Sequence, residues 1–372
     1  MTTNDGWVRT WAASPQAPTA GLGSLDDVPP FADVTLRQAV RITGGGHRIR
    51  VRFTNEYGTT PLVIGAARVN DRTLTFNGNP TAVVPAGAPI LTDPLDLSVP
   101  ALATLAISLY LPERVETCTC HDPALDDGWV IPGNADTLPA DAEPLPVRAL
   151  LSAVEVLPDT PATTVVVLGD SRVDGIGSTP GANRSWPELL AERSGRYVSN
   201  QGISGNRLLN DGLGDSGLRR FDRDVLATPG LSHVVVALGA NDIAISFAPQ
   251  DGPSDFLKMF PGDPVTPDDV IAGYRQLIAR AHGRGVKIYA ATTAPYEGDD
   301  IFTPEGDAAR RLVNDWIRTS GAFDAVLDFD EVWRDPEHPS RIREEFHMGD
   351  HLHGSDAGYQ AIADSIDLAL FR

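Results

Sequence analysis

The sequence predicts a two-domain protein, with an all-β sandwich or jelly roll over residues 1–158 and an α/β domain over residues 163–372. The second domain is expected to be a flavodoxin-like doubly wound parallel sheet. Three observations support this fold class. Short apolar runs between Gly, Pro, Asn and Asp fill the first part without a lasting 3.6-residue period. After residues 158–162, which contain two prolines, apolar strands alternate with helical stretches. A chain of 372 residues is also long for one compact domain.

Six apolar runs of the first part are expected to be strands. They cover residues 7–13, 35–42, 47–54, 62–69, 104–111 and 147–156. Three glycines at positions 44–46 join the second run to the third and predict a hairpin.

In the third run Arg48, Arg50 and Arg52 alternate with apolar residues, so one side of this strand packs inward and the other carries guanidinium groups. Arg37 and Arg41 could extend this row across the hairpin. We expect carboxylates to pair with these arginines, and ligand binding is the alternative.

Five apolar runs of the second part are expected to be strands with helical stretches between them. They cover residues 164–168, 197–200, 233–238, 286–292 and 325–329. Ser185 and Glu188 have the spacing of a capping box, and Thr266 precedes a proline and two acidic residues, as at a helix start. Further helices are expected over residues 304–319 and 355–370. Five such βα units favour the flavodoxin-like strand order.

The composition excludes several classes of partner. A formal net charge of −20 disfavours nucleic acid and anionic lipid. No apolar run approaches the ~18 residues of a membrane span, and the first residues lack a secretory signal. We therefore expect a cytoplasmic protein, or a secreted one whose leader is not part of this sequence. Cys118, Cys120 and His121 are too few ligands for a zinc site, so the cysteines are expected to be small apolar residues of a strand.

The candidate nucleophile is Ser171, which follows the buried run 164–168 and so lies at the carboxyl end of a strand, where open α/β sheets bind ligands. A serine hydroxyl needs a base within hydrogen-bond reach and a third group to orient that base. Asp350 and His353 are three residues apart, and on one helical turn they would share a side. His347 and His351 are the competing bases.

Two further segments could stabilise an oxyanion. Asn241 follows the strand 233–238 and offers an amide donor, and Gly205 follows the strand 197–200 and offers an unhindered N–H group. Each segment alone is also typical of an ordinary turn. Gly214-Asp215-Ser216-Gly217 resembles a nucleophile loop but follows a polar stretch, so Ser216 is expected to be a helix N-cap.

Four short motifs together carry a family resemblance. They are Gly169-Asp170-Ser171, Gly205, Gly239-x-Asn241-Asp242 and Asp350-x-x-His353, in this order across about 190 residues. The second domain thereby resembles the SGNH (GDSL) hydrolases. The first domain is similar, through Thr-Leu-Arg-Gln at 35–38 and Val-Ile-Gly-Ala-Ala at 63–67, to the β domain of some two-domain bacterial members.

The resemblance implies a serine esterase with a catalytic triad. In it Ser171 is the nucleophile, His353 the base and Asp350 the group that orients the base. The N–H groups of Ser171 and Gly205 and the side chain of Asn241 form the oxyanion hole. The resemblance also implies an acyl-enzyme and no cofactor, and we expect no metal ion.

Two residues depart from the family pattern. Arg172 replaces an aliphatic residue and adds a cation beside the nucleophile, which would favour a polar or anionic substrate group. Gly354 stands where related two-domain members often carry proline, which is expected to loosen the loop around His353. The apolar segment 247–265 is expected to form a lid or a wall of the acyl pocket, and a plug at the domain interface is the alternative. Its candidate substrate-binding residues are Phe256, Met259 and Phe260.

The sequence therefore predicts a carboxylic ester hydrolase that acts on short acyl groups such as acetyl, including those on carbohydrate, through an acyl-enzyme on Ser171. One alternative is a lysophospholipase or thioesterase with the same triad. Another is a carbohydrate-binding protein on a silent hydrolase scaffold.

Overall fold

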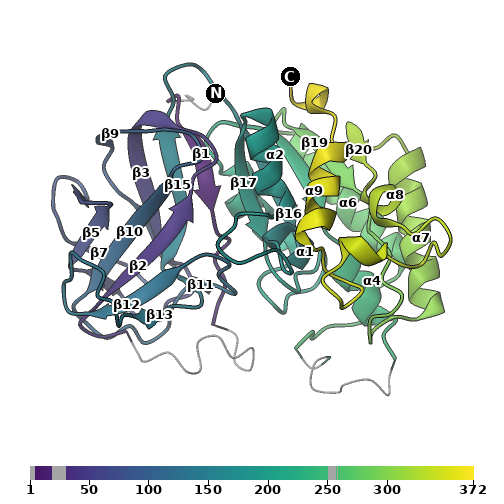
Figure 1. Cartoon of the computed structure of the whole chain (residues 1–372), viewed down its shortest axis with the longest axis horizontal. Helices are drawn as coiled ribbons and strands as arrows, with labels where there is room; N and C mark the ends of the chain where they lie inside the picture. The colour runs from purple at the N-terminus through teal and green to yellow at the C-terminus, as the bar shows by residue number, and fades with distance from the viewer. Residues whose placement is uncertain (1–4, 19–30, 250–256, 258) are drawn as a thin grey trace. The chain divides into compact units, whose positions relative to one another are not determined.

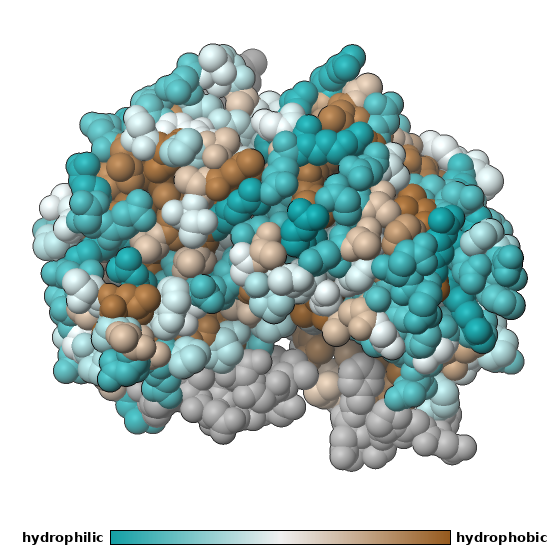
Figure 2. Space-filling model, in the orientation of Figure 1, coloured by the Kyte–Doolittle hydropathy of each residue, from teal (hydrophilic) through white to brown (hydrophobic). Residues whose placement is uncertain are grey.

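The computed structural model describes residues 5–18, 31–249, 257 and 259–372. The chain divides into two compact units, Met1–Ala162 and Thr163–Arg372 (Figure 1). No helix of the described residues is long and apolar enough to cross a membrane. Figure 2 shows hydrophilic residues over most of the visible face, in keeping with the high formal charge of the chain.

The first unit contains two larger antiparallel sheets, and the all-β prediction is thereby confirmed. The first sheet has the order β1 (Val8–Ala12), β15 (Leu151–Leu157), β3 (Gly46–Asn55) and β8 (Ala88–Leu91), and β9 (Leu95–Val99) also pairs with β3. The second has the order β13 (Glu143–Pro144), β12 (Gly128–Pro132), β2 (Val34–Arg41), β10 (Thr104–Leu111), β5 (Ala66–Val69) and β6 (Arg72–Leu74). Two small pairs are β4 (Leu62–Ile64) with β7 (Ala82–Val84) and β11 (Cys120–His121) with β14 (Arg148–Ala149). The jelly-roll topology stays a prediction.

The predicted hairpin at positions 44–46 is wrong. The strands β2 and β3 belong to different sheets, because β2 pairs with β10 and β12 whereas β3 pairs with β15, β8 and β9. The glycines serve close packing: a Cβ atom at Gly45 would lie 2.4 Å from the Val99 carbonyl oxygen, and one at Gly46 would lie 2.5 Å from that of Leu157. Glycine therefore indicates close backbone approach here and not a tight turn.

The arginines of β3 have carboxylate partners, as the sequence favoured. The ion pairs are Arg48 with Asp96 at 2.8 Å, Arg50 with Glu155 at 2.7 Å and Arg52 with Glu56 at 3.1 Å. The alternate residues of the strand are fully buried. The row therefore has a structural explanation.

Cys118 and Cys120 are free thiols, and Cys120 is buried in β11. Burial raises the pKa of Cys120 to about 12, so this thiol stays protonated. A protonated buried thiol packs as a small apolar residue, as expected for Cys120. Cys118 is half-buried and lies outside β11, so its placement in a strand was wrong.

The second unit is built on a parallel sheet whose order confirms the flavodoxin-like prediction. The order is β17 (Tyr197–Gly202), β16 (Thr164–Gly169), β18 (Leu231–Ala237), β19 (Lys287–Ala291) and β20 (Ala325–Leu327). Val165 and Val167 of β16 belong to one apolar cluster, and Val166 and Leu168 belong to another. Because both faces of this strand are buried, its sequence shows no polar alternation.

Helices cover both faces of this sheet (Figure 1). Residues of α2 (Trp186–Ser194) and α9 (Asp356–Ser365) belong to the first cluster, and residues of α6 (Pro267–His282) and α7 (Pro304–Thr319) to the second. The helices after Thr266 and Ser355 start as the sequence indicates, and Thr266 forms a capping box with Asp269. The capping box predicted at Ser185 does not form, because the Ser185 hydroxyl donates to the Glu188 side chain at 2.8 Å and caps no backbone N–H. The remaining helical segments are α1 (Ser171–Asp174), α3 (Gly217–Arg220), the π-helix Phe221–Leu226, α4 (Ala240–Ser246), α8 (Phe329–Trp333) and the 3₁₀ turns Glu344–Phe346 and Leu368–Phe371.

Candidate active site

Ser171 lies at the first position of α1, directly after β16. Asp170 caps this short helix by accepting the N–H of Arg172 at 3.1 Å. The strand-to-helix turn is crowded, since a Cβ atom at Gly169 would lie 2.1 Å from the Val173 side chain. Glycine before the Asp-Ser pair is therefore a steric requirement, and the turn presents Ser171 at the carboxyl edge of the sheet.

The structure brings Ser171, His353 and Asp350 into one chain of hydrogen bonds. The Ser171 Oγ lies 2.9 Å from His353 Nε2, and His353 Nδ1 lies 2.6 Å from Asp350 Oδ2. A carboxylate only accepts, so Nδ1 carries the proton and Nε2 presents its lone pair to the hydroxyl. Burial alone would raise the pKa of Asp350, but hydrogen bonds from the His353 ring and from two backbone N–H groups outweigh it and hold the pKa well below its usual range.

Asp350 and His353 lie on a tight turn of the chain. They do not lie on the helical turn that their three-residue spacing allowed. Asp350 Oδ1 accepts the N–H groups of Leu352 and His353, both at 2.9 Å. His351 between them has a φ of +61°, a left-handed conformation that the carboxylate helps to hold. The turn directs His353 to Ser171, whereas the His351 ring packs on the His347 ring at a centroid distance of 4.3 Å.

The loop that contains Gly205 is tied to the helix of the nucleophile. Ser204 donates to Asp174 Oδ2 through its N–H at 3.1 Å and its hydroxyl at 2.6 Å. Gly205 has a φ of +72°, which favours glycine. In the described part of the chain the N–H groups of Ser171 and Gly205 have no hydrogen-bond partner, so both are available to a bound oxygen atom.

Asn241 occupies the first turn of α4, the helix that follows β18. Its Nδ2 donates to the Asn206 carbonyl oxygen at 2.9 Å, which orients the amide and leaves its second N–H for another acceptor. Gly239, the N-cap, has a φ of +116°, and a Cβ there would lie 2.7 Å from Tyr274 Oη. The Gly-x-Asn spacing thus combines a required backbone conformation with an oriented donor.

Arg220 is a buried residue that the sequence reading missed. Its guanidinium donates to the carbonyl oxygens of Gly169 at 2.9 Å and Gln201 at 2.7 Å, to Asn206 Oδ1 at 3.1 Å, and to Asp224 at 3.2 Å. It therefore joins the ends of β16 and β17, which carry the nucleophile and the Gly205 loop. An arginine four residues before an aspartate in a helical stretch, at positions 220 and 224, is the signal in the sequence.

Asp242 is the last residue of the Gly239-x-Asn241-Asp242 motif, and the sequence alone indicates no function for it. Its carboxylate accepts the N–H groups of Leu208 at 2.6 Å and Leu209 at 2.9 Å, which anchors the loop after β17 to α4. Burial raises the pKa of Asp242 to about 6, although these two hydrogen bonds oppose the shift. Asp242 thus holds the two proposed oxyanion segments in register.

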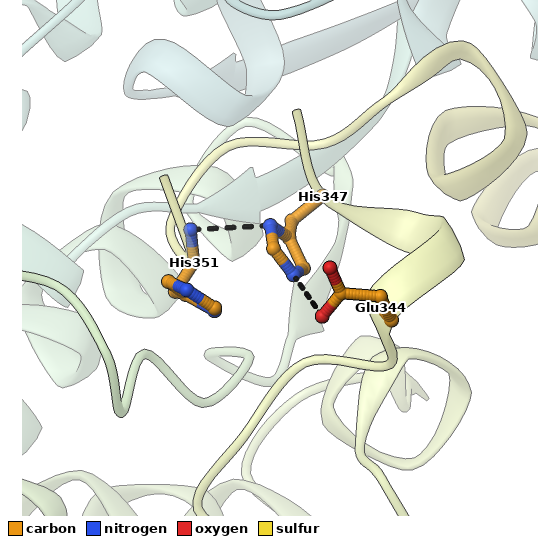
Figure 3. A group of neighbouring side chains, drawn as sticks. All are labelled: Glu344, His347 and His351. Carbon is orange, nitrogen blue, oxygen red and sulfur yellow. Dashed lines mark hydrogen bonds and ion pairs between the residues drawn. The ribbon is translucent and has the colours of Figure 1, made fainter. Parts of the chain in front are cut away.

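Glu344, His347 and His351 lie close enough together to suggest a metal site (Figure 3). However, His347 Nδ1 accepts the N–H groups of Gly349 at 3.0 Å and His351 at 3.2 Å. The Nε2 atom of this neutral ring therefore carries the proton, and it faces Glu344 at 3.4 Å. A proton on that nitrogen leaves no lone pair for a cation, so the geometry favours a role in holding the turn before His353.

Two pockets of about 390 and 280 Å³ lie beside the proposed nucleophile. Arg172, Ala240 and Thr293 line both. We call the smaller one the Arg172 pocket. It is lined by Arg172, Ala240, Asn241, Ile243, Ala244, Thr293, Tyr296, Arg310 and Leu352.

The two departures from the family pattern meet at Trp333. The Arg172 guanidinium lies 5.9 Å from the centre of the Trp333 ring, and a Cβ at Gly354 would lie 2.8 Å from the same ring. Arg172 also donates to the carbonyl oxygens of Leu352 at 3.0 Å and Ala294 at 3.4 Å. The expected loosening at Gly354 is thus replaced by close packing of the tryptophan against the turn.

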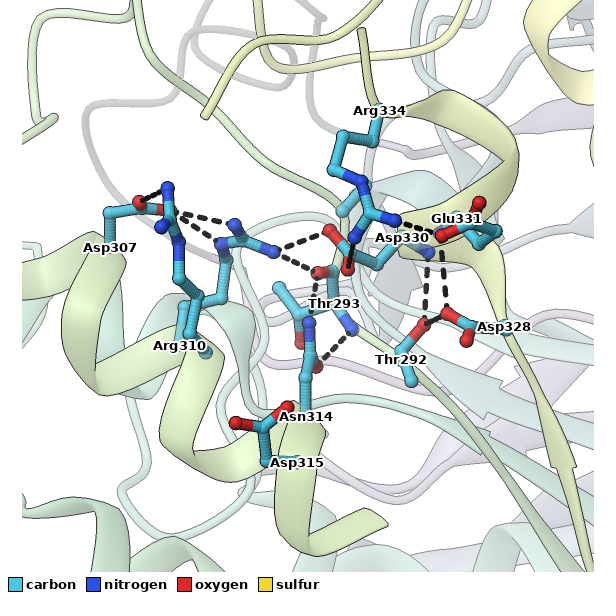
Figure 4. A network of polar contacts seen from close by, with 12 residues as sticks. Thr292, Thr293, Asp307, Arg310, Asn314, Asp315, Asp328, Asp330, Glu331 and Arg334 are labelled. Carbon is cyan, nitrogen blue, oxygen red and sulfur yellow. Dashed lines mark hydrogen bonds and ion pairs between the residues drawn. The ribbon is translucent and has the colours of Figure 1, made fainter. Parts of the chain in front are cut away.

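A buried ion network fixes the wall of the Arg172 pocket at Thr293 (Figure 4). The Thr293 carbonyl accepts from Arg310 and from Asn314, each at 2.8 Å, and its N–H donates to Asn314 at 2.8 Å. Arg310 in turn pairs with Asp307 and Asp330, each at 2.7 Å. The positive charge of Arg310 is therefore already neutralised inside the protein.

Two of the three apolar residues proposed for substrate binding, Met259 and Phe260, lie apart from these two pockets. Phe260 is buried, with the Arg207 guanidinium 5.6 Å from its ring centre, and Met259 is half-buried near Gly212. Neither lines the pockets of 390 and 280 Å³. Phe256 lies outside the described residues.

Comparison with known proteins identifies the family. The model of the GDSL-like lipase/acylhydrolase family matches residues 167–361, a range that includes the proposed triad and oxyanion hole. No curated protein matches the chain.

Similar solved structures include a GDSL-like lipase from Bacteroides thetaiotaomicron (18% identity, 56% of this chain and 88% of that chain, TM-score 0.41). A carbohydrate acetylesterase from Sinorhizobium meliloti is 15% identical over 56% of this chain and 100% of that chain, with a TM-score of 0.42. An aryl esterase from M. smegmatis is 16% identical over 56% of this chain and 96% of that chain, with a TM-score of 0.41. The family match spans more than half of the chain, which therefore belongs to the GDSL-like lipase/acylhydrolase family and is a carboxylic ester hydrolase.

Proposed function

We propose that the chain hydrolyses carboxylic esters with short acyl groups, such as acetyl esters, through an acyl-enzyme on Ser171. The observation that carries this proposal is the hydrogen-bond chain from Ser171 Oγ through His353 to Asp350, at 2.9 and 2.6 Å. Such a chain supplies a hydroxyl nucleophile, a base and the group that fixes the tautomer of the base.

The reaction follows from these groups. His353 Nε2 takes the Ser171 proton while Oγ attacks the carbonyl carbon, and the carbonyl oxygen becomes an oxyanion. The N–H groups of Ser171 and Gly205 and the second amide N–H of Asn241 donate to this oxygen. When the C–O bond to the alcohol breaks, His353 returns the proton to the leaving oxygen. Water then attacks the acyl-enzyme, with the imidazole acting again as base, and releases the acid.

The lining of the Arg172 pocket supports small acyl groups. The side chains of Ile243, Ala244 and Leu352 bound a space of about 280 Å³ that includes solvent at its mouth, so little room is left for a long chain. The proposal leaves the alcohol open, and an acetylated carbohydrate is one such ester. A role of the segment 247–265 as a lid or acyl-pocket wall stays a prediction.

The first experiment is hydrolysis of 4-nitrophenyl acetate by Ser171→Ala. We expect turnover to be lost while the protein stays folded, and Ser216→Ala, in the second Gly-Asp-Ser sequence, to keep full activity. Full activity of Ser171→Ala would refute the mechanism. A series of 4-nitrophenyl esters from C2 to C16 tests the acyl preference, since a preference for long chains would support the lysophospholipase or thioesterase alternative.

A further inference from the structure

Arg172 is a cation beside the nucleophile that has no carboxylate partner. Its guanidinium contacts the carbonyl oxygens of Leu352 and Ala294 and the face of Trp333. In the described part of the chain no Asp or Glu oxygen lies within 4.0 Å of its guanidinium. Burial lowers the pKa of Arg172, although the Asp170 and Asp350 carboxylates oppose this shift from beyond ion-pair distance. The positive charge is therefore only partly compensated, whereas partly buried arginines usually have a direct anionic partner.

Tyr296 lines the same pocket and carries a second unused donor, which lies against Gly306 at the start of α7. Its side chain is buried, with 3% of the residue exposed, and its hydroxyl has no hydrogen-bond partner in the structure. Burial raises the pKa of Tyr296 to about 12, so the phenol is protonated and able to donate at neutral pH. Leaving a buried hydroxyl unpaired costs stability, which is explained if a ligand provides the acceptor.

The lining of the Arg172 pocket otherwise carries no negative charge. Its charged residues are two arginines, and no aspartate or glutamate lines it. Arg310 is neutralised by Asp307 and Asp330, so Arg172 is the cation that remains for a ligand. The other lining groups are mainly apolar side chains, which would contact a short carbon chain and exclude water.

The pocket lies on the acyl side of the proposed reaction. Its walls come from residues next to each catalytic group: Arg172 follows Ser171, Leu352 precedes His353, and Asn241 is itself the amide donor. Neither Ser171 nor His353 lines the pocket, whereas the proposed oxyanion donor Asn241 does. An acyl group whose carbonyl oxygen is held by the Asn241 amide would therefore extend its chain into this pocket.

We propose that the Arg172 pocket binds an acyl group that ends in a carboxylate, so that the preferred substrates are hemiesters of short dicarboxylic acids. This inference rests on the proposed function. Arg172 pairs with the terminal carboxylate and Tyr296 donates a hydrogen bond to it. A neutral acceptor would take the same hydrogen bonds but would leave the guanidinium unpaired. The carboxylate takes no part in the chemical steps, and the products are the alcohol and the dicarboxylate.

The test compares two esters that differ in charge and little in shape. Monoethyl succinate carries a terminal carboxylate, and ethyl levulinate carries a methyl ketone in its place. Initial rates at neutral pH, followed in a pH-stat, give the ratio of kcat/KM for the two esters. For the wild type we expect a ratio of about 10 to 100 in favour of the hemiester, the range of one or two hydrogen bonds to a charged group.

Three variants identify the groups responsible. Arg172→Met should bring the ratio to about one or below. Tyr296→Phe should lower it by about 10-fold and should not lower the thermal unfolding midpoint, because the hydroxyl has no partner to lose. Arg114→Met removes a cation from the other unit, at a side chain that is 60% exposed, and should leave the ratio unchanged.

The outcomes separate this inference from the proposed function. A merely structural role of Arg172 would lower both kcat/KM values equally and leave the ratio intact, which would overturn the inference. A wild-type ratio at or below one would also overturn the inference. The same holds for a Tyr296→Phe variant that unfolds at a lower temperature and keeps the wild-type ratio. If Arg172→Met does not fold, Tyr296→Phe decides. Failure to hydrolyse 4-nitrophenyl acetate would refute the proposed function itself.

Discussion

Asp350→Asn should inactivate the enzyme through the tautomer of His353 and not through loss of structure. In the wild type Asp350 Oδ1 accepts two backbone N–H groups at 2.9 Å, and Oδ2 accepts His353 Nδ1–H at 2.6 Å. In the variant the amide oxygen must take the first position, because an NH₂ group cannot accept. The NH₂ group then donates to Nδ1, which moves the ring proton to Nε2 and removes the acceptor for the Ser171 hydroxyl.

The expected loss in kcat is about 10⁴-fold, the size of the effect when a triad carboxylate is replaced by an amide, which corresponds to about 5.5 kcal/mol of transition-state stabilisation. The assay is steady-state hydrolysis of 4-nitrophenyl acetate, in which KM should change little because Asp350 lies behind the imidazole. Asp364→Asn, an exposed acid on α9, is the control. A fall in kcat of less than about 10-fold would refute the tautomer argument.

Three further predictions concern stability. Arg310→Met should lower the free energy of unfolding by about 1.5–3 kcal/mol in urea, because Asp307 and Asp330 lose a fully buried partner and keep only the more exposed Arg311, Arg318 and Arg334, and a change below about 0.5 kcal/mol would contradict the role of the network. Gly354→Ala should cost about 1–3 kcal/mol, because its Cβ overlaps Trp333, and an unchanged thermal midpoint would count against that packing. Burial raises the pKa of Asp242 to about 6, so its ionisation in the fold is unfavourable and its own contribution to stability should fall as pH rises from 3.8 to 6. The stability of Asp242→Asn relative to the wild type should therefore increase with pH over this range, and a difference that does not change with pH would disprove it.

Local pattern was enough to predict several strands and the position of the nucleophile, although the run 62–69 divides into β4 and β5, which belong to different sheets. The apolar run 104–111 matches β10, and the run 164–168 lies within β16, because each is buried and bounded by polar or turn residues. The carboxyl ends of parallel strands lie at one edge of a sheet, so the prediction of a parallel sheet also places the motifs that follow its strands at that edge. The contact of His353 with Ser171 was therefore predictable across 182 residues.

Features that depend on pairing between distant segments could not be predicted. The glycines at 44–46 are typical of a tight turn between paired strands. Whether β2 and β3 pair with each other depends on the other strands, and here β2 pairs with β10 and β12 while β3 pairs with β15, β8 and β9. The contacts of Arg220 with two strand ends were equally hidden, since a single charged residue does not specify its partners. Gly354 was interpreted from the backbone alone, whereas its environment is set by Trp333.

The most direct test of the central claim is covalent labelling of the wild-type protein with a fluorophosphonate, followed by peptide mass spectrometry. This reagent forms a stable adduct with a serine whose hydroxyl is activated by a neighbouring base. We expect one adduct, on the peptide that contains Ser171, and a much slower reaction in His353→Ala. An adduct on Ser216, or none on Ser171, would contradict the account.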